Sequence, residues 1–139
     1  MEKIYSSFEA IQQDLKTQQT TCQEIVNDYL HRIEENKHLN AFLEVFADEA
    51  LQKAQEIDAK ITQNKAGKLA GMVIAIKDNI CYKDHKVSAS SKILGNFESL
   101  FSATVVERLL AEDAIIIGRT NCDEFAMGSS NENSAFGNV

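Results

Sequence analysis

Proline is absent from this 139-residue sequence, and glycine is absent from its first 66 residues. Because these residues are the strongest interrupters of regular structure, nothing in the first half breaks a helix. All six glycines lie after residue 66. We therefore expect residues 1–66 to form a helical segment and residues 67–139 to differ from it in character, and the length of the chain indicates one domain at most or a piece of a larger one.

Long apolar runs, paired cysteines and an excess of basic residues are also missing. No run approaches the roughly 20 residues of a membrane span, and the polar amino terminus lacks the apolar core of a signal peptide. Cys22, Cys81 and Cys122 are odd in number and widely spaced, which indicates free thiols in a reducing compartment. A net charge of −7 argues against a nucleic-acid-binding face. We expect a cytoplasmic globular protein with no membrane partner.

Three helices are predicted in the first half, where apolar residues recur at helical spacing. Their apolar faces are, in order, Ile4, Phe8, Ile11 and Leu15; Ile25, Val26, Tyr29, Leu30 and Ile33; and Ala50, Ala54, Ile57 and Ile61. The second helix should begin at a capping box, Thr21 to Glu24, and end near Asn36. The third should begin near Asp48, after a strand or extended link over residues 41–46.

Two of the three histidines, His31 and His38, lie in or just after the second predicted helix. They are seven residues apart and have no carboxylate or cysteine partner at ligand spacing. A metal site is one interpretation, but a pair of solvated surface side chains fits the spacing better. We expect no metal and no cofactor to be bound by this chain.

The second half is organised around the stretch Gly71–Ile80, in which the apolar run Met72–Ile76 ends at Lys77. The β-branched residues of the run predict a buried strand. A lysine kept neutral in apolar surroundings can accept a proton, so Lys77 is a candidate general base. The alternative is a lysine whose ammonium group simply reaches water from the end of a strand.

A second strand is predicted at Ala114–Ile117, a continuous apolar run bounded by Gly118 and typical of a strand covered on both faces. Between the strands we expect a polar loop at 79–91, a helical turn at 91–94, and a helix capped by Ser102 with Val105, Val106, Leu109 and Leu110 on its apolar face. Strand, helix and strand form a βαβ unit with parallel strands. Lys77 and residues 119–121 should then meet at the carboxyl edge of the sheet, where ligand sites lie.

The last stretch, Gly118–Gly137, is rich in small polar side chains and glycine. This composition suits a loop that approaches a ligand, although an ordinary surface loop has the same composition. Ser129 and Ser130 are candidate nucleophiles, but they lack the Gly-x-Ser-x-Gly turn and a neighbouring histidine. Cys122 has only Arg119 as a nearby cation, so an unreactive thiol is the favoured interpretation.

Four stretches together resemble the amidase signature family. They are Leu69–Ile80, Ala103–Leu110, Ile115–Asn121 and Asp123–Ser130, and the resemblance covers nearly the whole chain. It implies the α/β amidase-signature fold, in which residues 1–66 form an N-terminal helical layer and residues 67–139 begin the α/β core with the first strands of a mixed sheet. Both segments would be part of one larger domain, so the sheet would be incomplete within these 139 residues. Two departures are Val73 and Asn138, where the family commonly has proline.

The resemblance also implies a serine–cis-serine–lysine amidase. Lys77 would be the catalytic lysine and would take a proton through a bridging serine, while a second serine attacks the amide carbonyl. Asp78, Ser129 and Ser130 would have supporting roles, with Asp78 anchoring the backbone. In this family both catalytic serines lie in a Gly/Ser-rich segment further along the chain. We therefore expect these 139 residues to be the N-terminal portion of a longer enzyme and to be inactive alone.

Within the family, the stretch Asp123–Gly137 is similar to the glutaminase subunits of tRNA-dependent amidotransferases. That similarity implies release of ammonia from glutamine and its use to convert misacylated Glu-tRNA(Gln) to Gln-tRNA(Gln). The partners would be a B subunit, which uses ATP and Mg²⁺, and a small C subunit, in a heterotrimer. Two alternatives stay open: another amidase of the family acting on a small amide, and a non-catalytic helical interaction fragment.

Overall fold

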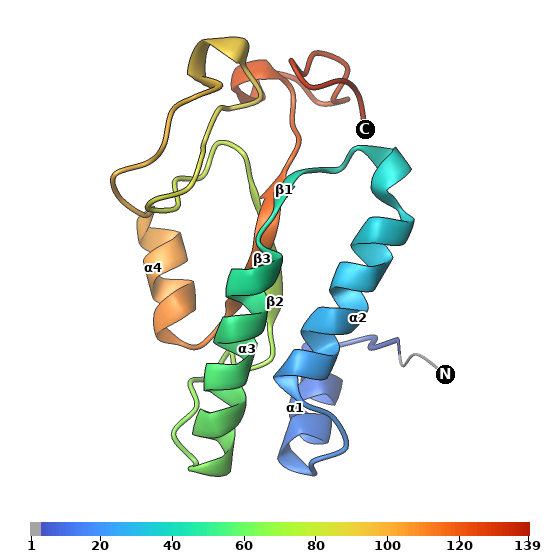
Figure 1. The fold of residues 1–139 in the computed structure, drawn as a ribbon, viewed down its shortest axis with the longest axis vertical. Helices are drawn as coiled ribbons and strands as arrows, with labels where there is room; N and C mark the ends of the chain where they lie inside the picture. The colour runs from blue at the N-terminus through green and yellow to red at the C-terminus, as the bar shows by residue number, and fades with distance from the viewer. Residues whose placement is uncertain (1–3) are drawn as a thin grey trace. The chain divides into compact units, whose positions relative to one another are not determined.

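The computed structural model describes residues 4–139 and confirms an α/β fold with a mixed sheet (Figure 1). The helices are α1 Phe8–Lys16, α2 Cys22–Glu35, α3 Ala47–Thr62 and α4 Thr104–Ala111, and the strands are β1 Phe42–Val45, β2 Val73–Lys77 and β3 Ile115–Thr120. Short 3₁₀ turns cover Lys37–Leu39, Lys92–Leu94 and Glu124–Ala126. Over residues 4–139, no helix is both long enough and apolar enough to cross a membrane.

The chain folds into two compact units. The first consists of the chain up to Glu35 with residues 46–74 and 109–117, and the second consists of residues 36–45, 75–108 and 118–139. Each unit takes segments from both sides of residue 66. The division of the sequence into segments 1–66 and 67–139 stays a prediction about the larger domain.

The helices α2 and α3 pack against each other in the first unit (Figure 1). Their predicted apolar faces are confirmed, since Ile25, Val26 and Ile57 are almost completely buried. α2 ends at Glu35 and α3 begins at Ala47, each one residue from its predicted position. Helical periodicity therefore located both helices without any knowledge of their partners.

The helix α1 begins at Phe8 because Ser7 caps it, its side chain accepting a backbone N–H of the first turn. Ile11 and Leu15 are its buried residues, as their spacing predicted. The prediction that Ile4 continues this face is wrong. Ile4 precedes the cap and is 78% exposed, because the helical spacing extends beyond the point at which the helix starts.

The first turn of α2 is held by two separate side-chain caps. The predicted capping box is confirmed: Thr21 Oγ1 accepts the N–H of Glu24 at 3.1 Å, and the Glu24 carboxylate accepts the N–H of Thr21 at 3.0 Å. In addition, Asp58 of α3 accepts the N–H groups of Cys22 at 2.7 Å and Gln23 at 3.2 Å. These bonds satisfy donors that a helix start otherwise leaves without partners.

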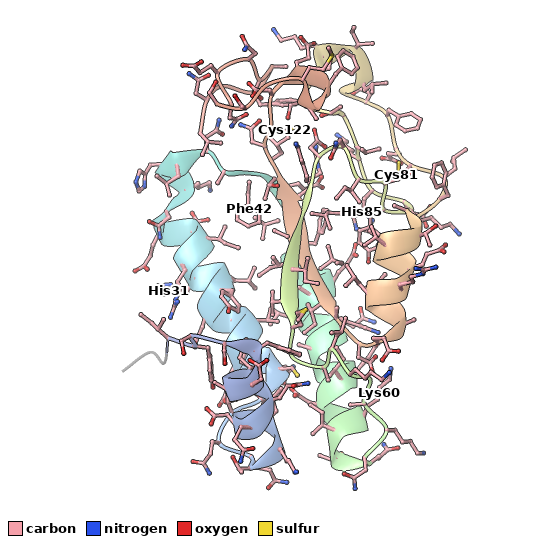
Figure 2. All side chains as sticks on the ribbon, turned by 180° about the vertical axis from the view of Figure 1, so that it is seen from behind. His31, Phe42, Lys60, Cys81, His85 and Cys122 are labelled. Carbon is pink, nitrogen blue, oxygen red and sulfur yellow. The ribbon has the colours of Figure 1, made fainter. Side chains whose placement is uncertain are left out.

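A buried carboxylate, Asp113, organises the turn before β3 in the first unit. Burial by itself would raise the pKa of this carboxyl group, but the hydrogen bond from Lys60 Nζ at 2.6 Å and that from the N–H of Gly67 at 2.8 Å hold it below its usual value. Figure 2 labels Lys60 on α3. At Gly67 a Cβ atom would lie 2.5 Å from the backbone of Glu112, so the turn requires glycine.

The sheet has the strand order β1-β3-β2. β1 runs antiparallel to β3, with Phe42 opposite Thr120 and Val45 opposite Gly118. β2 and β3 advance in the same direction, because the N–H of Ile115 bonds to Met72 at one end and the N–H of Asp78 bonds to Thr120 at the other. The predicted parallel pair is therefore confirmed, and the extended link at 41–46 is a strand.

The central strand β3 is buried over five of its six residues, as its continuous apolar run predicted. It extends to Thr120, whereas the predicted strand ended at Ile117, before Gly118. A Cβ atom at Gly118 would lie 2.5 Å from the carbonyl oxygen of Glu44 on β1. Glycine here allows two strands to approach closely and does not end the strand.

The strand β2 is not buried on both faces. Ile76 is buried, but Ala75 and Lys77 are exposed. Side chains alternate between the two faces of a strand, so Ala75 and Lys77 mark the face of β2 that is exposed within residues 4–139. The prediction of a buried strand therefore holds for Ile76 and is wrong for Ala75, because an apolar β-branched composition does not show which face of a strand is covered.

The connection that follows β2 matches its prediction in part. The turn at Lys92–Leu94 is confirmed, with Ser91 as its cap. α4 begins at Thr104, and Val106 is buried while Val105 is 52% exposed. Ser102 is not the helix cap, because its Oγ accepts the backbone N–H of Lys83 at 3.0 Å instead.

Candidate active site

Lys77 is the last residue of β2, and its side chain is exposed. Within residues 4–139 its ammonium group takes part in no hydrogen bond or ion pair. The residue that follows it, Asp78, donates its N–H to the carbonyl of Thr120 at 3.0 Å. The ends of the two parallel strands therefore meet, and the predicted meeting of Lys77 with residues 119–121 at one sheet edge is confirmed.

Asp78 is 1% exposed, and its carboxylate is fully engaged. Its oxygens accept the N–H of Ser88 at 3.1 Å, the hydroxyl of Ser88, and the N–H of Ser90 at 2.8 Å. Its third partner is Arg119, whose Nη1 donates to Oδ1. A buried carboxylate without such donors would be strongly disfavoured, so these groups are what make its burial possible.

Arg119 connects the two outer strands of the sheet through its guanidinium group. Nη1 bonds to buried Asp78, and Nε bonds to Glu44 of β1 at 3.0 Å. The two carboxylates differ in environment, since the Asp78 side chain is completely buried and that of Glu44 is 43% exposed. Arg119 was predicted to lie at this edge but had no predicted partner; a cation that ends an apolar strand was the available signal.

A second polar cluster surrounds Ser90, which was not among the residues predicted to form a site. Its hydroxyl lies 3.3 Å from the Cys122 thiol and 3.2 Å from Asn121 Oδ1, and it accepts the N–H of Cys122. Figure 2 shows Cys122 beyond the carboxyl end of β3. Asn121 in turn accepts the hydroxyl of Ser134. These bonds fasten the polar loop after β2 to the end of β3.

Two consecutive left-handed residues, Ala89 and Ser90, shape this loop. A second such pair, Phe125 and Ala126, lies against it, because the N–H of Phe125 bonds to the carbonyl of Ala89 at 2.8 Å. None of the four is glycine, so each adopts a backbone conformation that costs it energy. Strain of this kind persists only where surrounding contacts enforce it, and it occurs frequently at functional sites.

Ser129 and Ser130 are both exposed. The hydroxyl of Ser130 donates to Glu132 at 2.8 Å, and within residues 4–139 no hydrogen bond joins either serine to Lys77. Their loop is shaped by Asp123, whose carboxylate accepts two backbone N–H groups, those of Asn133 and Asn131, each at 2.9 Å. These N–H groups lower the pKa of Asp123.

The remaining candidate side chains do not form a site in the described part of the chain. His31 lies 3.3 Å from Glu35 one helical turn away, with both side chains more than half exposed. This carboxylate partner was not predicted from the spacing of the histidines. Among residues 4–139 no cluster of three His, Cys, Asp or Glu side chains could hold a metal ion. The three cysteines are free thiols, as predicted, and Cys22 and Cys122 are buried.

Comparison with known proteins shows the family to which this chain belongs. The family model described as Amidase matches residues 24–139, and the chain therefore belongs to the amidase family. It is similar to the A subunit of the glutamyl-tRNA(Gln) amidotransferase of Chlorobaculum tepidum, at 50% identity over 136 residues. That match covers 97% of this chain and 28% of the relative; the corresponding subunit of Pelodictyon phaeoclathratiforme is 51% identical and is covered to 29%.

Solved structures support the same fold. The peptide amidase of Stenotrophomonas maltophilia matches with a TM-score of 0.85 and 28% identity, over 96% of this chain and 29% of that one. An amidase family protein from Bacillus anthracis matches with a TM-score of 0.80 and 25% identity, over 87% and 25%. The chain thus spans less than a third of the length of each of these relatives. The resemblance found in the sequence to the amidase signature family is confirmed.

Proposed function

We propose that the complete protein is the glutamine-hydrolysing subunit of an amidotransferase that converts misacylated Glu-tRNA(Gln) to Gln-tRNA(Gln). One observation carries this proposal. Eight proteins that bear the name of the A subunit of that amidotransferase are 45–51% identical to this chain over at least 96% of its length. The similar solved amidases reach only 24–29% identity.

In the proposed reaction Lys77 accepts a proton from a bridging serine, which in turn takes the proton of a second serine. The second serine attacks the amide carbonyl of glutamine, and the proton passes back through the bridging serine to the nitrogen, which leaves as ammonia. Water then hydrolyses the acyl-enzyme to glutamate. Both serines belong to the family segment that is outside these 139 residues, so this chain by itself should be inactive. The position of Lys77 at the carboxyl edge of a parallel strand pair supports this role. Asp78, Ser129 and Ser130 are assigned supporting roles.

The proposal includes two partner subunits and a place of action. A B subunit would activate the glutamate of Glu-tRNA(Gln) with ATP and Mg²⁺, and a small C subunit would complete the heterotrimer. This chain itself would bind glutamine and no cofactor. The acidic composition and the free thiols of the chain support a cytoplasmic protein that contacts tRNA only through its partner.

The test is Lys77→Ala in the complete protein assembled with its partners. Glutamine hydrolysis should fall by about 100- to 10,000-fold, the range of general-base contributions. Amidation of Glu-tRNA(Gln) with ammonium chloride in place of glutamine should continue, because it bypasses the hydrolysis. Lys92→Ala removes an exposed lysine from the turn at 92–94 and is the matched control. Undiminished glutamine turnover in Lys77→Ala would refute the assignment.

A second candidate function is hydrolysis of another small amide without tRNA or partner subunits. The similarity to the Stenotrophomonas maltophilia peptide amidase favours it. The two functions separate in one experiment, in which the complete protein without partners receives glutamine or amidated peptides. Efficient turnover of the peptides, with no Gln-tRNA(Gln) formed when partners are added, would favour the second candidate.

A further inference from the structure

Asp78, the residue that follows Lys77, is held through both its backbone and its side chain. The N–H of Asp78 bonds to the carbonyl of Thr120 at 3.0 Å, and the carbonyl of Asp78 accepts the N–H of Ala89 at 2.8 Å. The Asp78 carboxylate is held at the same time by Ser88, Ser90 and Arg119. Every polar group of Asp78 therefore has a partner, whereas the side chain of Lys77 next to it makes no hydrogen bond or ion pair with residues 4–139.

Arg119 is the group in this cluster that compensates the charge of Asp78. The Asp78 side chain is completely buried, and the Arg119 side chain is 9% exposed. Buried charges persist when they are paired and hydrogen-bonded, and removal of one partner leaves the other without compensation. The pair also joins β2 to β3, because Asp78 directly follows β2 and Arg119 lies within β3.

We infer that the buried Asp78–Arg119 pair positions Lys77 for proton transfer, with Arg119 as a positioning residue that touches neither substrate nor Lys77. The inference rests on the proposed function. Lys77 is the exposed last residue of β2, which has a neighbouring strand on only one side in the described sheet, so the backbone of β2 is held by fewer ladder hydrogen bonds than that of a central strand. A clamp on the next residue fixes the Lys77 Cα and limits where its ammonium group can reach. A misplacement of about 1 Å can reduce a rate roughly 100-fold, so such a clamp has kinetic consequences.

The experiment compares Arg119→Met with wild type in the complete, partner-bound protein. We expect kcat for glutamine hydrolysis to fall by about 100-fold while KM stays within about threefold, because binding of glutamine does not require the lysine in position. Amidation from ammonium chloride should be retained, which shows that the complex is assembled. A purely structural role would lower both activities together.

Glu44→Gln is the matched control, because it removes the other carboxylate partner of the same guanidinium group. The Glu44 side chain is 43% exposed, so water can replace its bond to Arg119 Nε, and kcat should stay within about twofold of wild type. A kcat that falls equally in Glu44→Gln and Arg119→Met would overturn the inference. That result would show that the site does not depend on the buried pair.

If Arg119→Met lacks ammonium-dependent amidation and is therefore misfolded, the double variant Asp78→Asn/Arg119→Met decides. It removes both buried charges, so assembly and ammonium-dependent amidation should return. The glutaminase kcat should stay at least about tenfold low, because an amide cannot accept all the donors that hold the carboxylate. Recovery of both activities would show that the pair only stabilises the fold, and would overturn the inference.

The two proposals fail in different ways. Undiminished hydrolysis in Lys77→Ala refutes the proposed function, whatever Arg119→Met does. Loss of hydrolysis in Lys77→Ala with kcat of Arg119→Met within about threefold of wild type refutes only the positioning role.

Discussion

Replacement of Asp58 by alanine should loosen the start of α2 in the first unit. The Asp58 carboxylate belongs to α3 and accepts the N–H of Cys22 at 2.7 Å and that of Gln23 at 3.2 Å. Both bonds are partly buried, and the capping box serves the next donor along, the N–H of Glu24. The variant therefore removes the side-chain cap on two of the first donors of α2 and leaves the capping box intact.

The size of this effect follows from the two bonds. A hydrogen bond to a charged group contributes about 1.5–3 kcal/mol, and a single helix cap contributes about 0.5–2 kcal/mol. Water reaches a partly buried N–H group and recovers part of the loss. We therefore expect Asp58→Ala to lower the free energy of local unfolding at the start of α2 by about 2–4 kcal/mol.

Hydrogen exchange of the complete protein, followed by mass spectrometry on peptides that cover residues 20–30, measures this loss locally. Each 1.4 kcal/mol corresponds to about a tenfold change in the opening equilibrium. Exchange at the start of α2 should therefore accelerate about 30-fold or more. Asp48→Ala makes the same chemical change at an exposed position on α3 and should change exchange in α2 very little. Equal exchange in the two variants would refute the interhelical cap.

Two further predictions concern thiols and acid. Cys81 should react with a thiol reagent in the native protein, whereas Cys22 should react only after unfolding. Cys22 is fully buried, and burial together with Asp58 raises the pKa of its thiol. Mass mapping of the labelled cysteines checks this, and early labelling of Cys22 would contradict it. Since the pKa of Asp113 is lowered in the folded protein, its contribution to stability is present above the ordinary value of 3.8 and is lost as pH falls through the folded value. Lys60→Met removes a donor to Asp113, so the variant should be less stable than wild type near neutral pH and should lose less stability on acidification through the ordinary value of 3.8. Urea midpoints measured from neutral pH down to below that value would show this, and an equal loss in the two proteins would contradict the role of Lys60.

Local patterns predicted the helices well because their causes are local. The spacing of Ala50, Ala54 and Ile57 along α3 depends only on the period of a helix, and the Thr21–Glu24 capping box closes within four residues. The errors occur where a distant group competes. Ser102 was a reasonable cap by residue type, but the N–H of Lys83 takes its hydroxyl.

The sheet was predictable in the direction of its strands and not in their exposure. A βαβ unit requires parallel strands, so the order of elements along the chain was sufficient to bring Lys77 and Arg119 to one edge. Whether the face of β2 that carries Ala75 and Lys77 is covered depends on which other elements pack on it, and no property of the β2 sequence contains that information. The length of β3 was underestimated for a related reason, since Gly118 serves the approach of β1.

The polar cluster at the strand ends was beyond sequence reasoning because its members are far apart in the chain. Arg119 and Asp78 are 41 positions apart, and Ser90 and Cys122 are 32 positions apart. Neither residue of the left-handed pair Ala89–Ser90 is glycine, so the sequence does not indicate their conformation. Amino-acid type predicted that the loop is polar, but only the fold determines which hydroxyl and which N–H group meet the carboxylate.

The alternation of a strand explains why Lys77 and Asp78 have such different surroundings. Successive side chains at the end of β2 point to opposite faces, so Ile76 and Asp78 are buried while Lys77 between them is exposed. A lysine presented on the open face can therefore be held by an anchor on the closed face, one peptide away. A change at position 77 should remove the proposed proton acceptor, and a change at position 78 or at Arg119 should move it. Those two losses differ in kinetics, because only the second leaves a reactive lysine in the protein.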